Sequence, residues 1–171
     1  MVTKLLKITG LFLLLATLAG CPGEEDCFDM GSTARVDDLI KIQPLQTTYN
    51  QGDFITFKTE IPSQNNYFGE PINLFVNTND FEATLSTSYS NLFIGNELTF
   101  LKGSQGNEIN WFNVTYNPST SIYELEINIK LNKIGTYSLY TNDPIHFQGS
   151  TKCNRYRLDT NIEGWNSEGK I

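Results

Sequence analysis

An alternation of apolar and polar residues in the second half of the chain constrains the fold most strongly. Every second residue of segment 123–131 is apolar, and the residues between them are Glu124, Glu126, Asn128 and Lys130. Successive side chains of a β-strand point to opposite faces, so this pattern predicts a strand with one buried and one solvated face. Because no stretch after residue 27 shows a convincing 3.6-residue apolar period, we expect the folded part to consist of strands.

Further short segments of β-forming residues lie between clusters of Gly, Pro, Asn and Ser. Segment 109–116 is followed by the turn-forming residues 117–121, which predicts a hairpin with the strand at 123–131. The other candidate strands are 39–45, 54–61, 72–76, 81–87, 98–101, 135–141, 145–148 and 156–160. Nine or ten short strands at this spacing predict an all-β fold, an antiparallel β-sandwich.

Two stretches resemble parts of immunoglobulin-like domains. The sequence Tyr49-Asn-Gln-Gly-Asp-Phe-Ile-Thr-Phe57 is similar to the first turn and second strand of bacterial modules of this family. The sequence Lys133-Ile-Gly-Thr-Tyr-Ser-Leu139 is similar to the start of their strand F, where a Gly-x-Tyr forms a tyrosine corner. The resemblance implies an immunoglobulin-like sandwich of about nine strands, with the Tyr137 hydroxyl bonded to nearby backbone. Leu139 stands where antibody domains carry their second Cys, so the apolar core must hold without that disulfide.

The N-terminus has the layout of an export signal. Lys4 and Lys7 precede the apolar segment 8–18, which is shorter than the roughly 20 apolar residues of a transmembrane span. The tetrad Leu18-Ala19-Gly20-Cys21 that follows resembles the lipobox of bacterial lipoproteins. The resemblance implies that residues 1–20 are removed and that Cys21 carries a diacylglyceryl group, which makes membrane lipid a partner. The alternative is an ordinary secretory signal in which Cys21 is incidental.

A short acidic linker follows the lipidated cysteine. Pro22 and Gly23 disfavour a helix, and Glu24-Glu25-Asp26 is similar to the surface-export signals of lipoproteins in Bacteroidota. A solvated acidic spacer is the alternative interpretation. We therefore expect anchoring to the outer membrane, with the cell surface favoured over the periplasmic face. The chain as a whole resembles small immunoglobulin-like lipoproteins of Bacteroidota, divided into a signal peptide (1–20), a lipidated linker (21–37) and a sandwich domain (38–171).

The cysteine count fits this interpretation. The chain has three cysteines, and lipidation of Cys21 leaves Cys27 and Cys153 as a pair. Export implies an oxidising compartment, so we expect a Cys27–Cys153 disulfide, with two free thiols as the alternative. In the chain-entropy model so long a loop contributes on the order of 4–5 kcal/mol. Because five residues separate Cys21 from Cys27, a tether of roughly 20 Å at most would then hold the body near the bilayer.

Charge restricts the possible partners. The net charge is −7, and it becomes −9 when Lys4 and Lys7 leave with a signal segment that has no acidic residue. An acidic surface repels phosphate backbones, so nucleic-acid binding is not expected.

Few residues offer catalytic or metal-binding chemistry. His146 is the only histidine, and it is expected to point outward because its two apolar neighbours point inward. Glu124 and Glu126 share a strand face that we expect to be solvated rather than an acid–base site. The carboxylates Asp37, Asp38 and Asp53 show no ligand loop of recognisable spacing, so no metal, Ca²⁺ included, and no other cofactor is expected.

Loop aromatics are the candidate ligand contacts. Tyr67, Phe68 and Trp165 could stack on a sugar or dock a partner, although such residues also cap the ends of a core. We therefore hypothesise a non-enzymatic binding or structural accessory domain of the envelope that contacts an unknown envelope protein or glycan. A surface glycan-binding lipoprotein is the alternative, and a carboxylate-dependent hydrolase is the third hypothesis.

Overall fold

The part of the chain that the structure describes folds into short strands and one short helix. The computed structural model describes residues 31–87, 91–137, 139, 145–149 and 155–163. The helix in these residues is α2 (Leu74–Thr78). The strands are β1 (Ser32–Arg35), β2 (Ile40–Gln43), β3 (Phe54–Pro62), β4 (Gln64–Asn65), β5 (Ile72–Asn73), β6 (Glu82–Ser86), β7 (Glu97–Lys102), β8 (Ser104–Gln105), β9 (Trp111–Asn117), β10 (Ile122–Lys130), β11 (Ile145–Gln148) and β12 (Arg155–Asp159).

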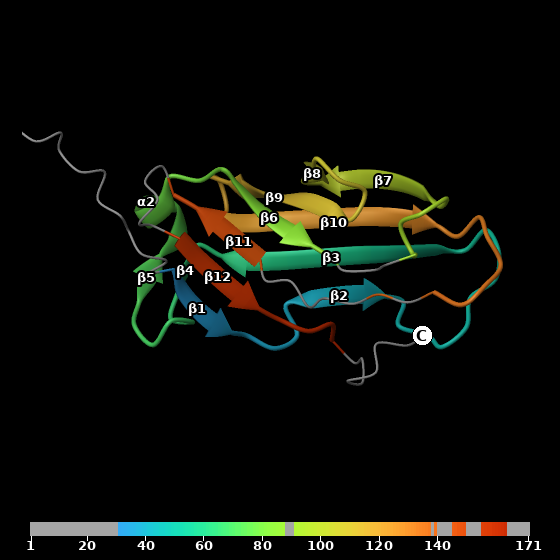
Figure 1. The fold of residues 1–171 in the computed structure, drawn as a ribbon, viewed down its shortest axis with the longest axis horizontal. Helices are drawn as coiled ribbons and strands as arrows, with labels where there is room; N and C mark the ends of the chain where they lie inside the picture. The colour runs from blue at the N-terminus through green and yellow to red at the C-terminus, as the bar shows by residue number, and fades with distance from the viewer. Residues whose placement is uncertain (1–30, 88–90, 138, 140–144, 150–154, 164–171) are drawn as a thin grey trace, which may run out of the picture.

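Ten of these strands form one continuous sheet that curls over itself (Figure 1). The main path runs β1-β12-β11-β6-β9-β10-β3-β2, while β7 pairs with β10 and β8 pairs with β9. A bridge between Ile40 and Ile162, with a 2.8 Å hydrogen bond from the Glu163 N–H to the Ile40 carbonyl, joins β2 to the chain that follows β12. The two halves of the sheet therefore enclose a core, as in a sandwich.

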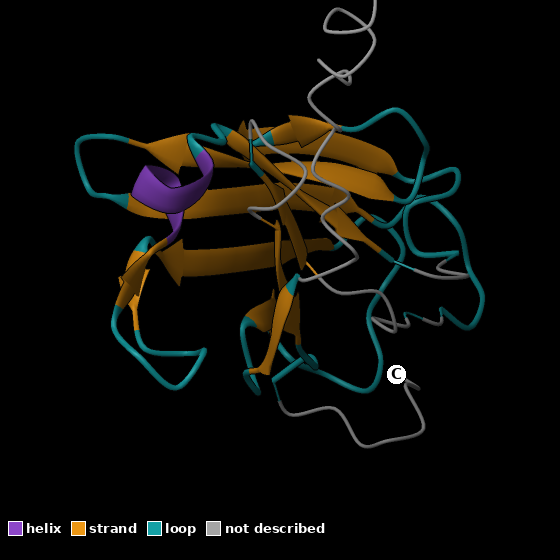
Figure 2. Cartoon of the chain, turned by 60° about the vertical axis from the view of Figure 1, so that its left-hand side comes forward, coloured by secondary structure: helices purple, strands orange, loops and turns teal. Residues whose placement is uncertain are grey.

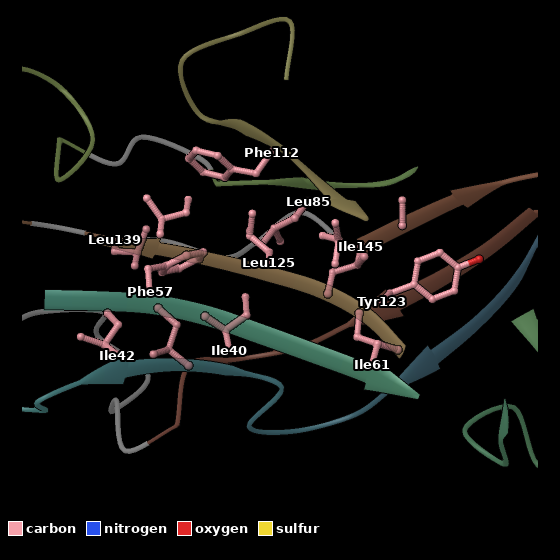
Figure 3. Packing of buried hydrophobic residues seen from close by; sticks show 14 of the residues in the cluster. Ile40, Ile42, Phe57, Ile61, Leu85, Phe112, Tyr123, Leu125, Leu139 and Ile145 are labelled. Atoms are coloured by element: carbon pink, nitrogen blue, oxygen red, sulfur yellow. The ribbon is translucent and has the colours of Figure 1, made fainter. Parts of the chain in front are cut away.

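Strand β10 is the centre of the sheet. It pairs with β3 along its whole length, and its other edge is shared by β9 and then β7. Its inward side chains are buried, as the alternation predicts, and they are Tyr123, Leu125, Ile127 and Ile129. Figure 3 shows side chains of β3 and β10, among them Phe57 and Leu125, packed together in the core. The centroid of the Phe112 ring lies 6.1 Å from that of Phe57 and 4.7 Å from that of Phe93.

The all-β prediction is confirmed, and so are most strands. The hairpin between β9 and β10 closes as expected, with the Ser121 N–H donating to the Asn117 carbonyl at 2.8 Å. The turn before β3 is also present, because the Asn50 N–H donates to the Asp53 carboxylate and the Asp53 N–H to the Asn50 carbonyl. The pairing of β1 with β12 is parallel, whereas the other named strand pairs are antiparallel. An immunoglobulin-like topology remains a prediction.

Of the predicted strand at 72–76, only the first two residues form a strand, and the prediction is wrong from Leu74 onward. Asn73 caps a helix there, since its side-chain oxygen accepts the Val76 N–H at 3.1 Å. Asn79 ends the helix in the left-handed conformation, where Asn is tolerated. The two Asn caps, together with a hydrogen bond from the Phe75 N–H to the Ser63 hydroxyl, stabilise a helix in a segment whose β-branched and aromatic residues favour a strand. Figure 2 shows α2 and the β4–β5 hairpin at the same end of the curled sheet.

Two other boundaries differ from the prediction. Ser32–Arg35, which we expected within the linker 21–37, instead pairs with β12 as β1, so the folded domain begins before residue 38. The predicted strand at 135–141 is absent from its described residues, 135–137 and 139. The Tyr137 hydroxyl nevertheless donates to the Lys133 carbonyl four residues upstream, as the tyrosine-corner resemblance implies. Leu139 is buried, also as expected of a core position.

Candidate functional site

The paired glutamates of β10 differ from the expectation of a solvated face. The Glu124 carboxylate is only 11% exposed because Lys102 and Asn117 cover it, donating hydrogen bonds at 2.5 Å and 2.9 Å. Lys102 ends β7 and lies opposite Glu126, and its ammonium also lies 3.9 Å from Glu60 and 4.0 Å from Glu126. The sequence pattern missed this cover because Lys102 and Asn117 come from the neighbouring strands β7 and β9.

Burial and pairing act in opposite directions on Glu124. Burial alone would raise the pKa of this carboxyl, but the hydrogen bonds from Lys102 and Asn117 and the charge of Lys102 outweigh it, so the net pKa is lowered. The same hydrogen bond raises the pKa of Lys102, and the nearby carboxylates add to this effect against burial. A carboxylate held ionised in this way is a poor proton donor at neutral pH.

The remaining candidates for acid–base or metal chemistry have separate structural partners. His146 lies on the outer side of β11 between two buried residues, as predicted. Asp37 accepts a hydrogen bond from Arg35, Asp38 from Asn161, and Asp53 from the Asn50 N–H. Among the described residues no group of three or more His, Cys, Asp or Glu side chains could hold a metal ion.

Two of the three predicted ligand-contact aromatics, Tyr67 and Phe68, pack against the core. Phe68 makes an edge contact with Tyr156, with the ring centroids 5.1 Å apart. Tyr67 is half-buried beside the core cluster, and this burial raises the pKa of its hydroxyl. Both rings therefore contribute to packing at the α2 end of the molecule. Trp165, like Cys21, Cys27 and Cys153, lies outside the described residues.

A different aromatic residue lies on an open polar groove. The groove has a volume of about 460 Å³ and is lined in part by outward residues of β6, β9 and β11. We call it the Trp111 groove, and its lining includes Glu82, Thr84, Asn107, Trp111, Asn113 and Gln148. The lining side chains on strands point outward because their strand neighbours, among them Ala83, Leu85 and Phe112, are fully buried, and Asn107 lies on the loop after β8.

The sheet register aligns several polar side chains along this groove. Thr84 of β6 lies opposite Asn113 of β9, and Asn113 lies opposite Ser104 of β8. On the other side of Thr84, His146 of β11 continues the row. Apart from His146, the sequence pattern does not single out these residues, because they become neighbours only through strand pairing. The outward position of Trp111 at the start of β9 was the available signal.

Comparison with known proteins gives no relative from which the role of the groove could be inferred. No protein-family model, curated protein or solved structure matches the chain. Within the described part of the chain, α2 is the only helix, and it is neither long nor apolar enough to span a bilayer.

Proposed function

We propose that this protein is a lipid-anchored domain of the bacterial outer membrane that acts by binding rather than by catalysis. The tetrad Leu18-Ala19-Gly20-Cys21, placed directly after a short apolar segment with basic flanks, carries the proposal. Each buried acyl CH₂ contributes roughly 0.8 kcal/mol, so two or more chains on Cys21 would hold the domain on the membrane in effect permanently. The protein would then meet its partners at the membrane surface.

The position of β1 supports a short connection between anchor and domain. β1 begins at Ser32, only 11 residues after Cys21, so the tether spans at most about 39 Å. Ser32 pairs with Tyr156, whose hydroxyl accepts a hydrogen bond from Asn77 of α2. The end of the molecule that carries α2 and the β4–β5 hairpin would therefore face the bilayer.

The parallel pairing of β1 with β12 also supports the proposed disulfide. Because the two strands run parallel, both enter the sheet at the same end, with Ser32 opposite Tyr156. Cys27 precedes Ser32 by five residues and Cys153 precedes Tyr156 by three. A bond between them would shorten the tether to the five residues between Cys21 and Cys27.

The state of the acidic residues supports binding over hydrolysis. The Glu124 carboxylate is occupied by Lys102 and Asn117, and its lowered pKa opposes a role as a general acid. The Asp80 carboxylate accepts backbone N–H groups from Glu82 at 3.1 Å and Gln148 at 2.8 Å. These bonds fix strands β6 and β11 in place, which is a structural role.

Fractionation of cells that produce the full chain tests the anchoring. The wild-type protein should sediment with membranes, resist extraction by high salt and alkaline carbonate, and partition into the detergent phase. Cys21→Ser, which removes the acceptor thiol, should lose the detergent partitioning, whereas Cys153→Ser should keep it. Equal partitioning of wild-type protein and Cys21→Ser would contradict the proposal.

A further inference from the structure

We propose that the Trp111 groove binds an uncharged carbohydrate chain. The inference gives the proposed binding role a ligand class, so it rests on that role, but it does not depend on acylation of Cys21. Two features of the groove support the inference. An exposed indole lies in it, and amide, hydroxyl and carboxylate groups line it, several of them on paired strands.

Trp111 projects outward from a backbone that several hydrogen bonds hold in place. Its residue is 40% exposed, although it begins a strand whose next residue, Phe112, is fully buried. The Trp111 carbonyl accepts hydrogen bonds from the Gly106 N–H and the Gln105 side chain, both at 2.8 Å. The Trp111 N–H donates to the Glu108 carbonyl at 3.0 Å. These bonds fix the backbone from which the indole projects. An aromatic side chain has only two rotatable bonds, so it offers an apolar face at low entropic cost, and the C–H face of a pyranose ring is a suitable partner.

Gly106 has a specific role in this arrangement. A Cβ atom on Gly106 would lie 2.9 Å from the Trp111 carbonyl oxygen and 3.0 Å from its Cβ. The absence of a side chain therefore allows the loop after β8 to lie directly against Trp111 and to form one wall of the groove.

The polar lining matches the hydrogen bonding of sugar hydroxyls. A hydroxyl donates and accepts, and the side chains of Asn107, Asn113 and Gln148 can each do both. Glu82 is exposed at the start of β6 and supplies a charged acceptor that can hold two adjacent hydroxyls. Asp80, in contrast, has each carboxylate oxygen bonded to a backbone N–H, so it shapes the wall of the groove.

Charge distinguishes an uncharged glycan from an anionic one. The lining residues in the described part of the chain include Asp80 and Glu82 but no Lys or Arg. With a net charge of −9 after signal removal, the surface would repel sulfated, phosphorylated or uronate-rich chains. The groove is therefore suited to neutral polysaccharides.

Affinity electrophoresis of the full-length, lipidated protein in detergent tests this inference. Native gels would contain starch, xylan, galactomannan or laminarin as neutral probes and polygalacturonate as the anionic probe. We expect at least one neutral polysaccharide to retard the protein and polygalacturonate to have no effect. Trp111→Ala should weaken the binding by about tenfold or more, as expected for a buried aromatic contact. Glu82→Ala should weaken it severalfold without touching the core.

Matched variants give the comparison its specificity. Phe54→Ala removes another exposed aromatic ring, 59% exposed and on β3, and should leave binding within about twofold of wild type. Trp165→Ala tests the residue that the sequence predicts as a contact and should have the same small effect. Circular dichroism establishes that each variant is folded. If Trp111→Ala does not fold, the loss of binding in Glu82→Ala tests the groove instead.

Three results would overturn the inference. These are no retardation by any neutral probe, unchanged binding by a folded Trp111→Ala, or equal losses in Trp111→Ala and Phe54→Ala. The intact mass of the same preparation reports lipidation independently. A lipidated protein that binds no probe would contradict the glycan inference alone, and a binding protein without lipid would contradict the anchoring alone.

Discussion

Replacing Lys102 by Met should destabilise the fold much more than replacing Lys130 by Met. The two lysines are almost equally exposed, at 40% and 41%, and they lie on the paired strands β7 and β10. They differ in their partners, because Glu124 is 11% exposed and 2.5 Å from Lys102, while Glu97 is 63% exposed and 4.0 Å from Lys130. The comparison therefore measures how much burial of one carboxylate strengthens an ion pair.

The expected magnitudes follow from this difference. Leaving a fully buried partner unpaired costs about 3–5 kcal/mol, and the partial exposure of Lys102 reduces the expected loss to about 1–2 kcal/mol. For Lys130→Met the ion pair and the contact with the Phe54 ring, 5.9 Å away, together contribute less than about 1 kcal/mol. Urea unfolding, followed by circular dichroism, measures both losses in the free energy of unfolding. The comparison requires that both variants keep the m-value of the wild type.

The pH dependence provides a second readout of the same pair. The pKa of Glu124 is lowered in the folded state, so its contribution is present above the unfolded pKa of about 4.3 and is lost as pH falls through the folded pKa. The pKa of Lys102 is raised, so its contribution is present below about 10.4 and is lost as pH rises through the folded pKa.

In Lys102→Met, acidification should relieve the uncompensated charge of Glu124. The stability difference between this variant and wild type should therefore narrow as pH is lowered from about 7 to about 4. Equal losses for Lys102→Met and Lys130→Met, or a Lys102→Met loss that does not change over this range, would refute the assigned role of the pair.

Three further predictions concern the fold. Gly103 has a φ of 74° and a Cβ there would clash with the Asn113 carbonyl, so Gly103→Ala should cost at least about 2 kcal/mol; Gly52→Ala, at a φ of 92° in open space, should cost about 1 kcal/mol in the same urea titration. Thr59 is buried and its hydroxyl has no hydrogen-bond partner among the described residues, so Thr59→Val should raise stability by about 1 kcal/mol, and a loss would show that the hydroxyl is satisfied. Non-reducing peptide mapping of membrane-extracted protein should recover Cys27 linked to Cys153, and two free thiols would exclude the bond.

The strands could be predicted where the residue pattern is local. The alternation around Leu125 and Ile127 identifies β10 because each side chain reports its own face of the sheet. The helix α2 could not be predicted from hydrophobic pattern, since its first N–H groups are accepted by the side chains of Asn73 and of Ser63, ten residues earlier. β1 was missed for a related reason, because Ser32–Arg35 is polar and short and gains its strand conformation from pairing with β12.

The candidate site could be predicted only in part, because strand register brings its residues together. Asn113 and Thr84 are 29 residues apart in the sequence and directly opposite in the sheet. The cover over Glu124 likewise requires the tight turn at Gly103, which takes the chain from β7 on β10 to β8 on β9. Composition and alternation identify the outward face of a strand, but they do not identify which residues face it from the next strand.

The mass of the intact protein, purified from the membranes of its native host, tests the central claim most directly. The account predicts a chain that begins at Cys21 and carries the added mass of a diacylglyceryl group and its acyl chains. Mild base hydrolysis of the ester-linked acyl chains should then reduce this mass in steps. A chain with an unmodified Cys21, or one cleaved at another residue, would contradict the account.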